Sequence, residues 1–258
     1  MASQVARFRA TPDSVDLYIA TRAPVTAFDS VATTNAQPYA KFWLNSRTSQ
    51  DMFKDSVAVK GTGEMSWTRR LAAGPYYYRV EAIMPGMRAA GRTAAMMMMG
   101  ADTSTGFALR GFGMSDLLLA TSAEGNAPSR WRDVRIAPLT APVAVGGEVA
   151  VVWETYETGR RGADAMYHVA ITLERERAKG GRMGMRILNG IADMPRSRET
   201  PNTVVIEYDR TARYAAAIVD NVTLSLGETP PGAYTLSVTV TDRVSGRSTT
   251  RTGGIVIR

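Results

Sequence analysis

The segment Thr229-Pro-Pro-Gly-Ala-Tyr-Thr-Leu-Ser-Val238 decides the fold, because a Pro/Gly turn leads directly into a strand with alternating apolar side chains. A second turn and the β-branched run Ile255–Ile257 follow it. An earlier segment, Leu71-Ala-Ala-Gly-Pro-Tyr-Tyr-Tyr-Arg-Val80, shows the same order of turn, strand, turn and closing strand, and it leads into Met96–Met99. Such a terminal hairpin is typical of a β-sandwich, so its two occurrences predict two sandwich domains in tandem.

Short β-branched segments bounded by Gly, Pro, Asn or Asp recur along the rest of the chain, while helical patterns are scarce. We therefore expect an all-β protein with two tandem immunoglobulin-like β-sandwich domains. The small polar segment Thr121–Arg130 is the best candidate for a linker, because it lacks the apolar periodicity of its neighbours. This placement predicts an N-terminal domain of residues 1–124 and a C-terminal domain of residues 125–258.

The composition limits the classes of function. The chain carries 31 basic and 24 acidic side chains, a net charge of +7, and it has no cysteine, which excludes disulfides, thiolate metal sites and cysteine nucleophiles. No apolar run approaches the roughly 20 residues that a membrane-spanning helix needs. The first residues also lack the apolar core of a signal peptide. We expect the protein to meet a membrane only from outside.

Catalytic motifs are absent from the sequence. His168 is the only histidine, and the alternation of Met166–Leu173 turns it away from the apolar face, toward solvent. No Gly-x-Ser-x-Gly motif supplies a nucleophile, and the glycine-rich spots at Gly61–Gly63 and Gly111–Gly113 read as turns. We expect no enzymatic activity, no catalytic residues, no cofactor and no metal. An enzyme with an unrecognised site stays an alternative that His168→Ala would test.

Two groups of residues are candidates for contacts with a partner. The first group lies in one predicted hairpin and consists of Tyr76, Tyr77, Tyr78, Met96, Met97, Met98 and Met99. Four consecutive methionines make both faces of a strand apolar, so the segment is either a buried central strand or an adaptable contact surface. Tyrosine is enriched at protein interfaces, which favours a contact role for the neighbouring strand.

The second group is rich in arginine and consists of Arg175, Arg177, Arg182 and Arg186. A basic hairpin at these positions could bind acidic lipid headgroups or an acidic protein surface. Nucleic acid is not expected, because residues 168–207 contain no aromatic side chain for base stacking. The alternative is a solvated hairpin in which acidic side chains balance the arginines.

Several segments resemble the C-terminal part of bacterial GWxTD-domain proteins: Gln4–Arg9, Ser14–Ile19, Met114–Ala120 and Pro231–Asp242. The namesake Gly-Trp-x-Thr-Asp motif is missing, and the nearest string, Ser66–Arg70, lacks its glycine and aspartate. The resemblance implies paired β-sandwich modules of exported proteins, with no catalytic residues to carry over. It favours a periplasmic location peripheral to the membrane, with a cytoplasmic location as the alternative because no signal peptide is present.

The sequence therefore predicts a non-enzymatic structural or interaction protein. Its partners would be other protein subunits, and the sharpest form of the hypothesis is a membrane-extrinsic scaffold, similar to extrinsic subunits of bacterial photosynthetic reaction-centre and light-harvesting complexes. The alternative is a carbohydrate- or peptide-binding accessory module, which needs exposed aromatic side chains. The sequence offers the Tyr76–Tyr78 triplet and four tryptophans for that role: Trp43, Trp67, Trp131 and Trp153.

Overall fold

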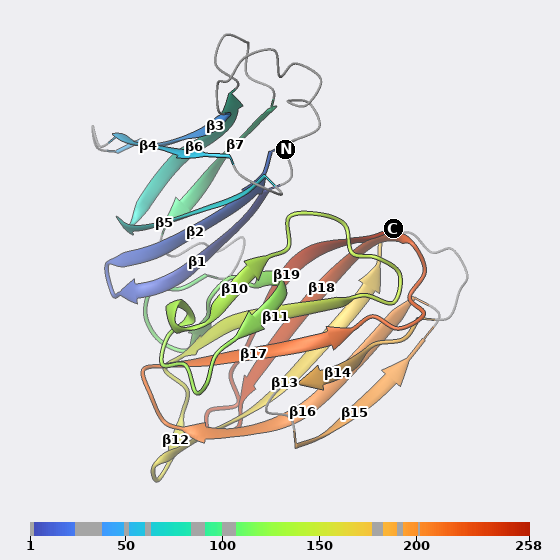
Figure 1. Cartoon of the computed structure of the whole chain (residues 1–258). Coiled ribbons are helices and arrows are strands. Elements are labelled where there is room, and N and C mark those ends of the chain that lie inside the picture. Colours follow the sequence, from blue (N-terminus) through green and yellow to red (C-terminus); the bar gives the residue numbers. More distant parts are fainter. Residues whose placement is uncertain are drawn as a thin grey trace. The chain divides into compact units, whose positions relative to one another are not determined.

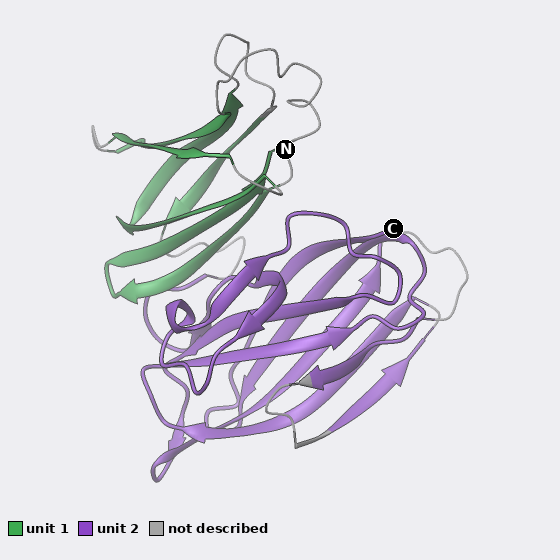
Figure 2. Ribbon diagram, in the orientation of Figure 1, with its two compact units in different colours: residues 1–102 green, residues 103–258 purple. Residues whose placement is uncertain are grey.

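The computed structural model describes residues 3–23, 38–48, 52–59, 63–83, 91–99, 107–176, 183–189, 193–200 and 202–258. It divides into two compact units, Met1–Asp102 and Thr103–Arg258 (Figures 1 and 2). Within the described ranges the regular elements are β-strands and one 3-10 helix of three residues. The chain is therefore all-β, as the sequence predicted.

Unit 1 is a sandwich of two antiparallel sheets, ordered β1-β2-β5 and β4-β3-β6-β7 (Figure 1). Its strands are β1 (Ser3–Thr11), β2 (Ser14–Arg22), β3 (Tyr39–Ser46), β4 (Met52–Ala58), β5 (Glu64–Ala72), β6 (Gly74–Ile83) and β7 (Gly91–Met99). The rings of Phe42 on β3 and Trp67 on β5 stack with centroids 5.3 Å apart. Because these strands belong to different sheets, the stacked pair joins the two layers through the core.

Unit 2 is a larger sandwich, with sheets ordered β10-β9-β11-β17-β14 and β15-β16-β13-β18-β19. The first sheet contains β9 (Leu118–Glu124), β10 (Arg135–Pro138), β11 (Glu148–Tyr156), β14 (Arg186–Asn189) and β17 (Ala217–Ser225), with β8 (Gly113–Met114) paired to β11. The second contains β13 (Asp164–Arg175), β15 (Asp193–Glu199), β16 (Thr203–Arg213), β18 (Gly232–Asp242) and β19 (Ser248–Ile257), with β12 (Arg160–Arg161) paired to β13.

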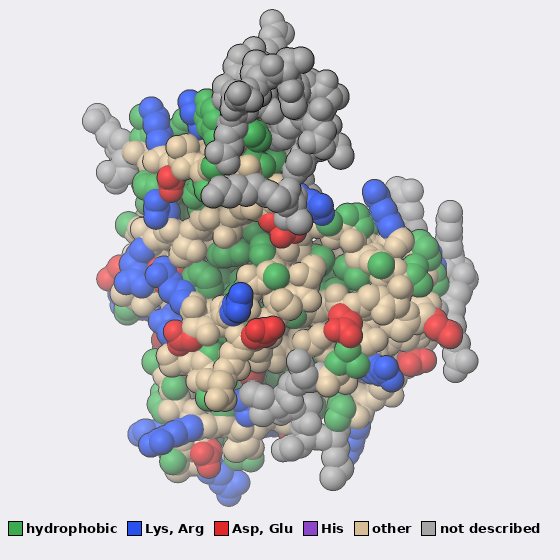
Figure 3. Space-filling model, viewed as in Figure 1, with side chains coloured by type: hydrophobic (Ala, Val, Ile, Leu, Met, Phe, Trp, Pro, Cys, Tyr) green, Lys and Arg blue, Asp and Glu red, His purple; other side chains and the backbone are tan. Residues whose placement is uncertain are grey.

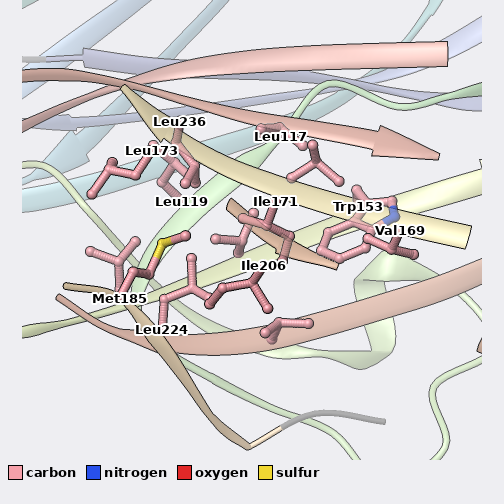
Figure 4. Close-up of a cluster of buried hydrophobic side chains, with 14 of the residues drawn as sticks. Leu117, Leu119, Trp153, Val169, Ile171, Leu173, Met185, Ile206, Leu224 and Leu236 are labelled. Carbon is pink, nitrogen blue, oxygen red and sulfur yellow. The ribbon is translucent and has the colours of Figure 1, made fainter. Parts of the chain in front are cut away.

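Alternating side chains of the two sheets fill the core of unit 2. Figure 4 shows Trp153 of β11 beside Val169 and Ile171 of β13, which are fully buried. Along β18 every second residue points into this cluster, from Tyr234 through Val240. The period of two in the sequence therefore marks the face that the fold buries.

The two units share one pairing order. Strands β9-β11-β17 of unit 2 correspond to β1-β2-β5 of unit 1, and β16-β13-β18-β19 correspond to β4-β3-β6-β7. In unit 1 β4 pairs with β3, and in unit 2 the corresponding strand β16 pairs with β13. In both units the last two strands form a hairpin. This order is immunoglobulin-like, and it confirms the predicted fold class of two tandem β-sandwiches.

The boundary between the units differs from the predicted one. The structure divides after residue 102, whereas the sequence placed the division between residues 124 and 125. The reason is that β9 pairs with β11, with Leu119 opposite Val151, and β9 also pairs with β10. Residues 121–124 of the predicted linker thus lie in a strand of unit 2.

The last residue of the predicted linker, Arg130, is bound by a buried carboxylate. Glu154 is fully buried, and both of its oxygens accept hydrogen bonds from Arg130, at 2.9 and 3.0 Å. It also accepts from the backbone N–H of Trp131 at 2.8 Å and the hydroxyl of Tyr156 at 2.9 Å. This clamp fixes the 3-10 helix η1 (Trp131–Asp133) against β11. A buried charge is tolerated because it is paired and hydrogen-bonded.

Candidate interaction surface

The outward side of the sheet β4-β3-β6-β7 carries a group of exposed apolar side chains. The exposed fractions are 57% for Met52, 54% for Met96, 42% for Met98 and 38% for Tyr77. Three of the four strands contribute to the group, and we call these four residues the contact patch. Scattered apolar side chains are common on protein surfaces, but a contiguous group of large ones is typical of an interaction site.

Strand register brings the contact patch together. Met52 lies opposite Asn45 of β3, Asn45 lies opposite Tyr77 of β6, and Tyr77 lies opposite Met96 of β7. Met52, Asn45, Tyr77 and Met96 form one row across the sheet, in which the polar Asn45 lies between Met52 and Tyr77, and Met98 follows two positions beyond Met96. Directly opposed side chains in antiparallel strands are about 5 Å apart at Cβ, so the row forms a continuous surface.

Basic side chains surround the contact patch. The Arg79 guanidinium lies 4.2 Å from the centre of the Trp43 ring in the next row, and Arg47 Nη1 lies 3.4 Å from the sulfur of Met96. Lys54 is exposed in the same row as Trp43. The Arg79 guanidinium makes a cation–π contact with the Trp43 ring, and Trp43 is half-buried. The surface is thus apolar at its centre and positively charged around it.

One acidic side chain on this face is already occupied. Glu81 accepts a hydrogen bond from Arg92 Nε at 2.7 Å and lies 3.5 Å from Arg79 Nε. Among the described residues that face outward from these four strands, Glu81 is the only acidic one. A partner with carboxylates around an apolar centre would therefore complement the charge of this face.

Strand β7 lies at the edge of its sheet. The sheet order places β6 on one side of β7 and no further strand of the described chain on the other. Arg7 of β1 donates from Nη1 to the backbone oxygen of Met98 at 2.8 Å, which occupies part of this edge. Among the described residues β7 is thus an edge strand and not a central one, and Met96 and Met98 on it are exposed.

The first group of predicted contact residues divides between core and surface. Tyr76, Tyr78 and Met99 are buried inside unit 1, since β6 and β7 alternate between the two faces. Met97 is half-buried. Tyr77, Met96 and Met98 keep the predicted exposure, and their contact role stays a prediction. Met52 escaped the sequence analysis because register, which a single strand does not encode, places it in the row.

The second predicted group does not form one hairpin. Arg175 ends β13, where its Nη2 donates to the backbone oxygen of Pro231 at 2.8 Å and its guanidinium lies 5.8 Å from the Tyr234 ring. Arg186 is exposed and begins β14, which pairs with β17 in the other sheet. The chain crosses between sheets here, so the two arginines lie on different layers. Arg177 and Arg182 lie outside the described residues.

The tryptophans do not supply an aromatic platform for sugars. Trp67, Trp131 and Trp153 are buried, and Trp43 lies under Arg79. Their burial follows from their apolar strand faces, because a large ring contributes most when it is removed from water. The carbohydrate-binding alternative therefore lacks the exposed coplanar rings that it needs in the described part of the chain.

His168 lies on the outer face of β13, as predicted. Its Nδ1 is 3.1 Å from Asp209 Oδ1, and Arg243 Nη2 donates to the same oxygen at 2.7 Å. Thr241 lies opposite His168 in the β13–β18 ladder, but its hydroxyl is hydrogen-bonded to Ser248, and no hydrogen bond that the structure describes joins His168 to a hydroxyl group. Within the same residues, no three His, Cys, Asp or Glu side chains gather closely enough to hold a metal ion.

No helix in the described ranges is long and apolar enough to cross a membrane. No family model matches the chain, and a search of curated proteins finds no match. The resemblance to GWxTD-domain proteins and the link to photosynthetic complexes thus gain no support from these comparisons, and both stay predictions.

Several solved structures are similar to this chain at low identity. The C-terminal domain of the Streptococcus pyogenes antigen I/II-family protein AspA is 8% identical over 98% of both chains, with a TM-score of 0.29. The major pilin SpaD from Corynebacterium diphtheriae is 8% identical over 86% of this chain and 59% of its own, with a TM-score of 0.27.

A family 123 glycoside hydrolase from Clostridium perfringens is 10% identical over 56% of this chain and 27% of its own, with a TM-score of 0.32. The assignment of this chain to the immunoglobulin-like β-sandwich class rests on its strand pairing and not on these similarities. The pairing order of the two units defines a tandem sandwich protein. Because a sandwich fold hosts many unrelated functions, function has to be inferred from the geometry of the contact patch.

Proposed function

We propose that this chain is a non-enzymatic interaction module whose contact patch docks onto a partner protein. The observation that carries the proposal is the row Met52, Asn45, Tyr77 and Met96, which exposes three large apolar side chains on one face of the sheet, with Tyr77 and Met96 on neighbouring strands. Methionine side chains repack readily against different surfaces, and tyrosine supplies a rigid, amphipathic contact. Burying this patch removes apolar surface from water, which is the main driving force of protein association.

The charges around the patch define the partner's chemistry. Arg47, Lys54 and Arg79 lie next to the apolar row, whereas Glu81 already faces two arginines. The matching surface would be apolar at its centre, with Asp and Glu at its rim. Such complementarity contributes mainly to the association rate and to the choice of partner.

A single charge in the patch tests the proposal. Met96→Glu places a carboxylate at an exposed position of the apolar row, where it does not disturb the core of unit 1. Wild-type and variant chains would be expressed in the source cells, extracted in mild detergent and separated on native gels. We expect the wild-type chain to migrate with a larger complex, and the variant to lose about tenfold or more of its affinity, as substitution of a central interface residue does.

Val256→Glu is the matched control. Val256 is 42% exposed on β19 of unit 2, so the substitution adds the same charge at a similar exposed position outside the patch. We expect it to leave the complex intact. Migration of the wild-type chain alone, or equal loss of the complex in both variants, would contradict the proposed role of the patch.

More specifically, we propose that the partner is a membrane protein complex and that this chain is a scaffold subunit on its periplasmic side. The reaction-centre and antenna complexes of photosynthetic bacteria are the example that the sequence suggested. Sedimentation with membranes of the source cells tests this form. Release by a high-salt wash would implicate charged contacts, including Arg186 with acidic headgroups, and absence from the membrane fraction would exclude the scaffold.

A further inference from the structure

A cavity of about 550 Å³ lies in unit 2 beside the short strand β12. Its floor comes from the start of β13, including Met166, and its walls come from β12, the end of β16 and the turn after β18. Figure 3 shows basic side chains, with an acidic one between them, near the position where Figure 1 labels β12. The volume falls within the range of about 300–1,000 Å³ that small-molecule sites occupy.

Four arginines contribute to the lining: Arg160, Arg161, Arg210 and Arg243. Two of them have carboxylate partners. Arg210 Nε lies 3.2 Å from the buried Asp220, which also accepts a hydrogen bond from Tyr167 at 2.7 Å. Arg243 Nη2 lies 2.7 Å from Asp209. These two carboxylates balance two of the four positive charges.

The other two arginines keep their charge uncompensated. Arg160 and Arg161 form no ion pair with any residue that the structure describes, although Arg160 lies 5.5 Å from the ring of Tyr214. Asp164 is opposite Arg161 in the β12–β13 ladder, but it makes no ion pair with Arg161 and does not line the cavity. The cavity therefore carries an excess of two guanidinium groups.

The carboxylate on the cavity wall, Asp209, interacts with Arg243 and His168. The pKa of Asp209 is lowered below its ordinary value, chiefly by the hydrogen bond from Arg243; burial opposes this shift, and the hydrogen bond with His168 adds a smaller lowering effect. Asp209 therefore stays ionised and committed to Arg243. Arg160 and Arg161 are therefore available to bind an anionic ligand.

We propose that this cavity binds a small organic dianion, whose two negative charges are carried by carboxylate or phosphate groups. Guanidinium groups hold both kinds of anion through paired N–H donors, and the two uncompensated arginines match two negative charges. Met166 and Val244 line the same cavity and offer apolar contact for the ligand's carbon skeleton. This site is separate from the contact patch, which belongs to unit 1, so either proposal can fail without the other.

Isothermal titration calorimetry on the full chain tests the site with defined probes. Succinate supplies two carboxylates and glucose 6-phosphate supplies a phosphate, while acetate and glucose serve as the singly charged and neutral comparisons. We expect one of the two dianions to bind to one site per chain, and acetate and glucose to bind at least about tenfold more weakly. The stronger of the two dianions identifies the anionic group. The absence of measurable binding by both would overturn the proposal.

Substitutions locate the binding. Arg160→Gln and Arg161→Gln each remove an exposed charge from the cavity, and we expect each to weaken the bound dianion by about tenfold. Arg135→Gln is the matched control, because Arg135 is an exposed arginine of unit 2 on β10 that does not line the cavity. Unchanged affinity in both cavity variants, or equal weakening in the control, would overturn the assignment of the site.

Discussion

Gly74 and Gly232 occupy matching positions in the two units, each as the first residue of the strand that enters the last hairpin. Their φ angles are +153° and +158°, and a Cβ built on either would approach the ring of the tyrosine two residues later, Tyr76 or Tyr234. A positive φ in this range is readily adopted only by glycine. The same backbone device therefore starts the same strand twice, which is the structural basis of the repeated sequence pattern.

Replacing Gly232 by alanine is expected to destabilise unit 2 by about 1–3 kcal/mol, because the φ angle is strained for any other residue. The added Cβ would also lie 3.3 Å from Arg175 Nε and 3.4 Å from the Tyr234 ring. Urea denaturation measures the loss. Gly254→Ala is the control, since a Cβ there meets nothing within 4 Å and its φ is not positive. Equal stability of the two variants would contradict the role of the backbone angle.

The hydroxyl of Tyr234 ties the start of β18 to the preceding turn. It donates to the backbone oxygen of Pro230 at 2.6 Å, in the arrangement known in immunoglobulin-like folds as a tyrosine corner. Tyr234→Phe is expected to lower the free energy of unfolding by about 1 kcal/mol, because it removes this bond and keeps the ring. Tyr214→Phe changes an exposed tyrosine and should have no measurable effect on the urea midpoint.

The clamp between Arg130 and Glu154 should matter far more than an ion pair at the surface. Arg130→Met leaves a fully buried carboxylate without its charge partner, at a cost of about 3 kcal/mol. Arg198→Met breaks the exposed ion pair with Glu207, where we expect less than about 1 kcal/mol. Thermal unfolding of both variants gives the comparison. Similar losses in the two would show that Glu154 is not dependent on Arg130.

Asp242 makes stability depend on acid pH. Burial opposes its ionisation, but hydrogen bonds from Ser245, Val244 and Gly159 outweigh this effect and lower its pKa below the ordinary value of 3.8. Between the folded and the unfolded pKa, Asp242 is protonated in the unfolded chain and ionised in the folded chain. Its contribution to the free energy of unfolding is therefore fully present above pH 3.8 and is lost as the pH falls through the folded pKa.

Asp242→Asn should therefore flatten the acid limb of the free energy of unfolding plotted against pH, and lower the stability at neutral pH. Ser245→Ala removes the hydroxyl donor to Asp242 but keeps the backbone N–H donor of residue 245, so its curve should lie between the others. Urea denaturation at a series of acid pH values gives the slopes. Parallel curves for wild type and Asp242→Asn would show that this carboxylate does not carry the effect.

Much of the fold follows from local patterns. The alternation that buries Tyr234, Leu236 and Val238 is visible in the sequence, because strand geometry sends successive side chains to opposite faces. The candidate surface was only partly visible. Tyr77 and Met96 were predicted as contacts, whereas the burial of Tyr76 depends on which face of β6 meets the other sheet.

Other features depend on contacts between residues that are distant in the sequence. The polar composition of Thr121–Arg130 favoured a linker, but pairing of β9 with β11 and the clamp on Glu154 bring the segment into unit 2. The charge of the cavity in unit 2 likewise comes from three separate chain segments: β12, β16 and the turn after β18. The spacing of residues along the sequence does not show which distant segments come together, so the cavity was not predicted.

The sequence by itself determined the all-β class, the two sandwiches and the hairpin that each contains, because turn glycines and a period of two act within a few residues. Only the tertiary structure decided that β7 lies at the edge of the described sheet, that Met52 lies in the row of Tyr77 and Met96, and that Arg160 and Arg161 line a cavity without an ion pair to any described residue. Those outcomes depend on which strands lie side by side, and strand pairing is settled by packing across the whole domain.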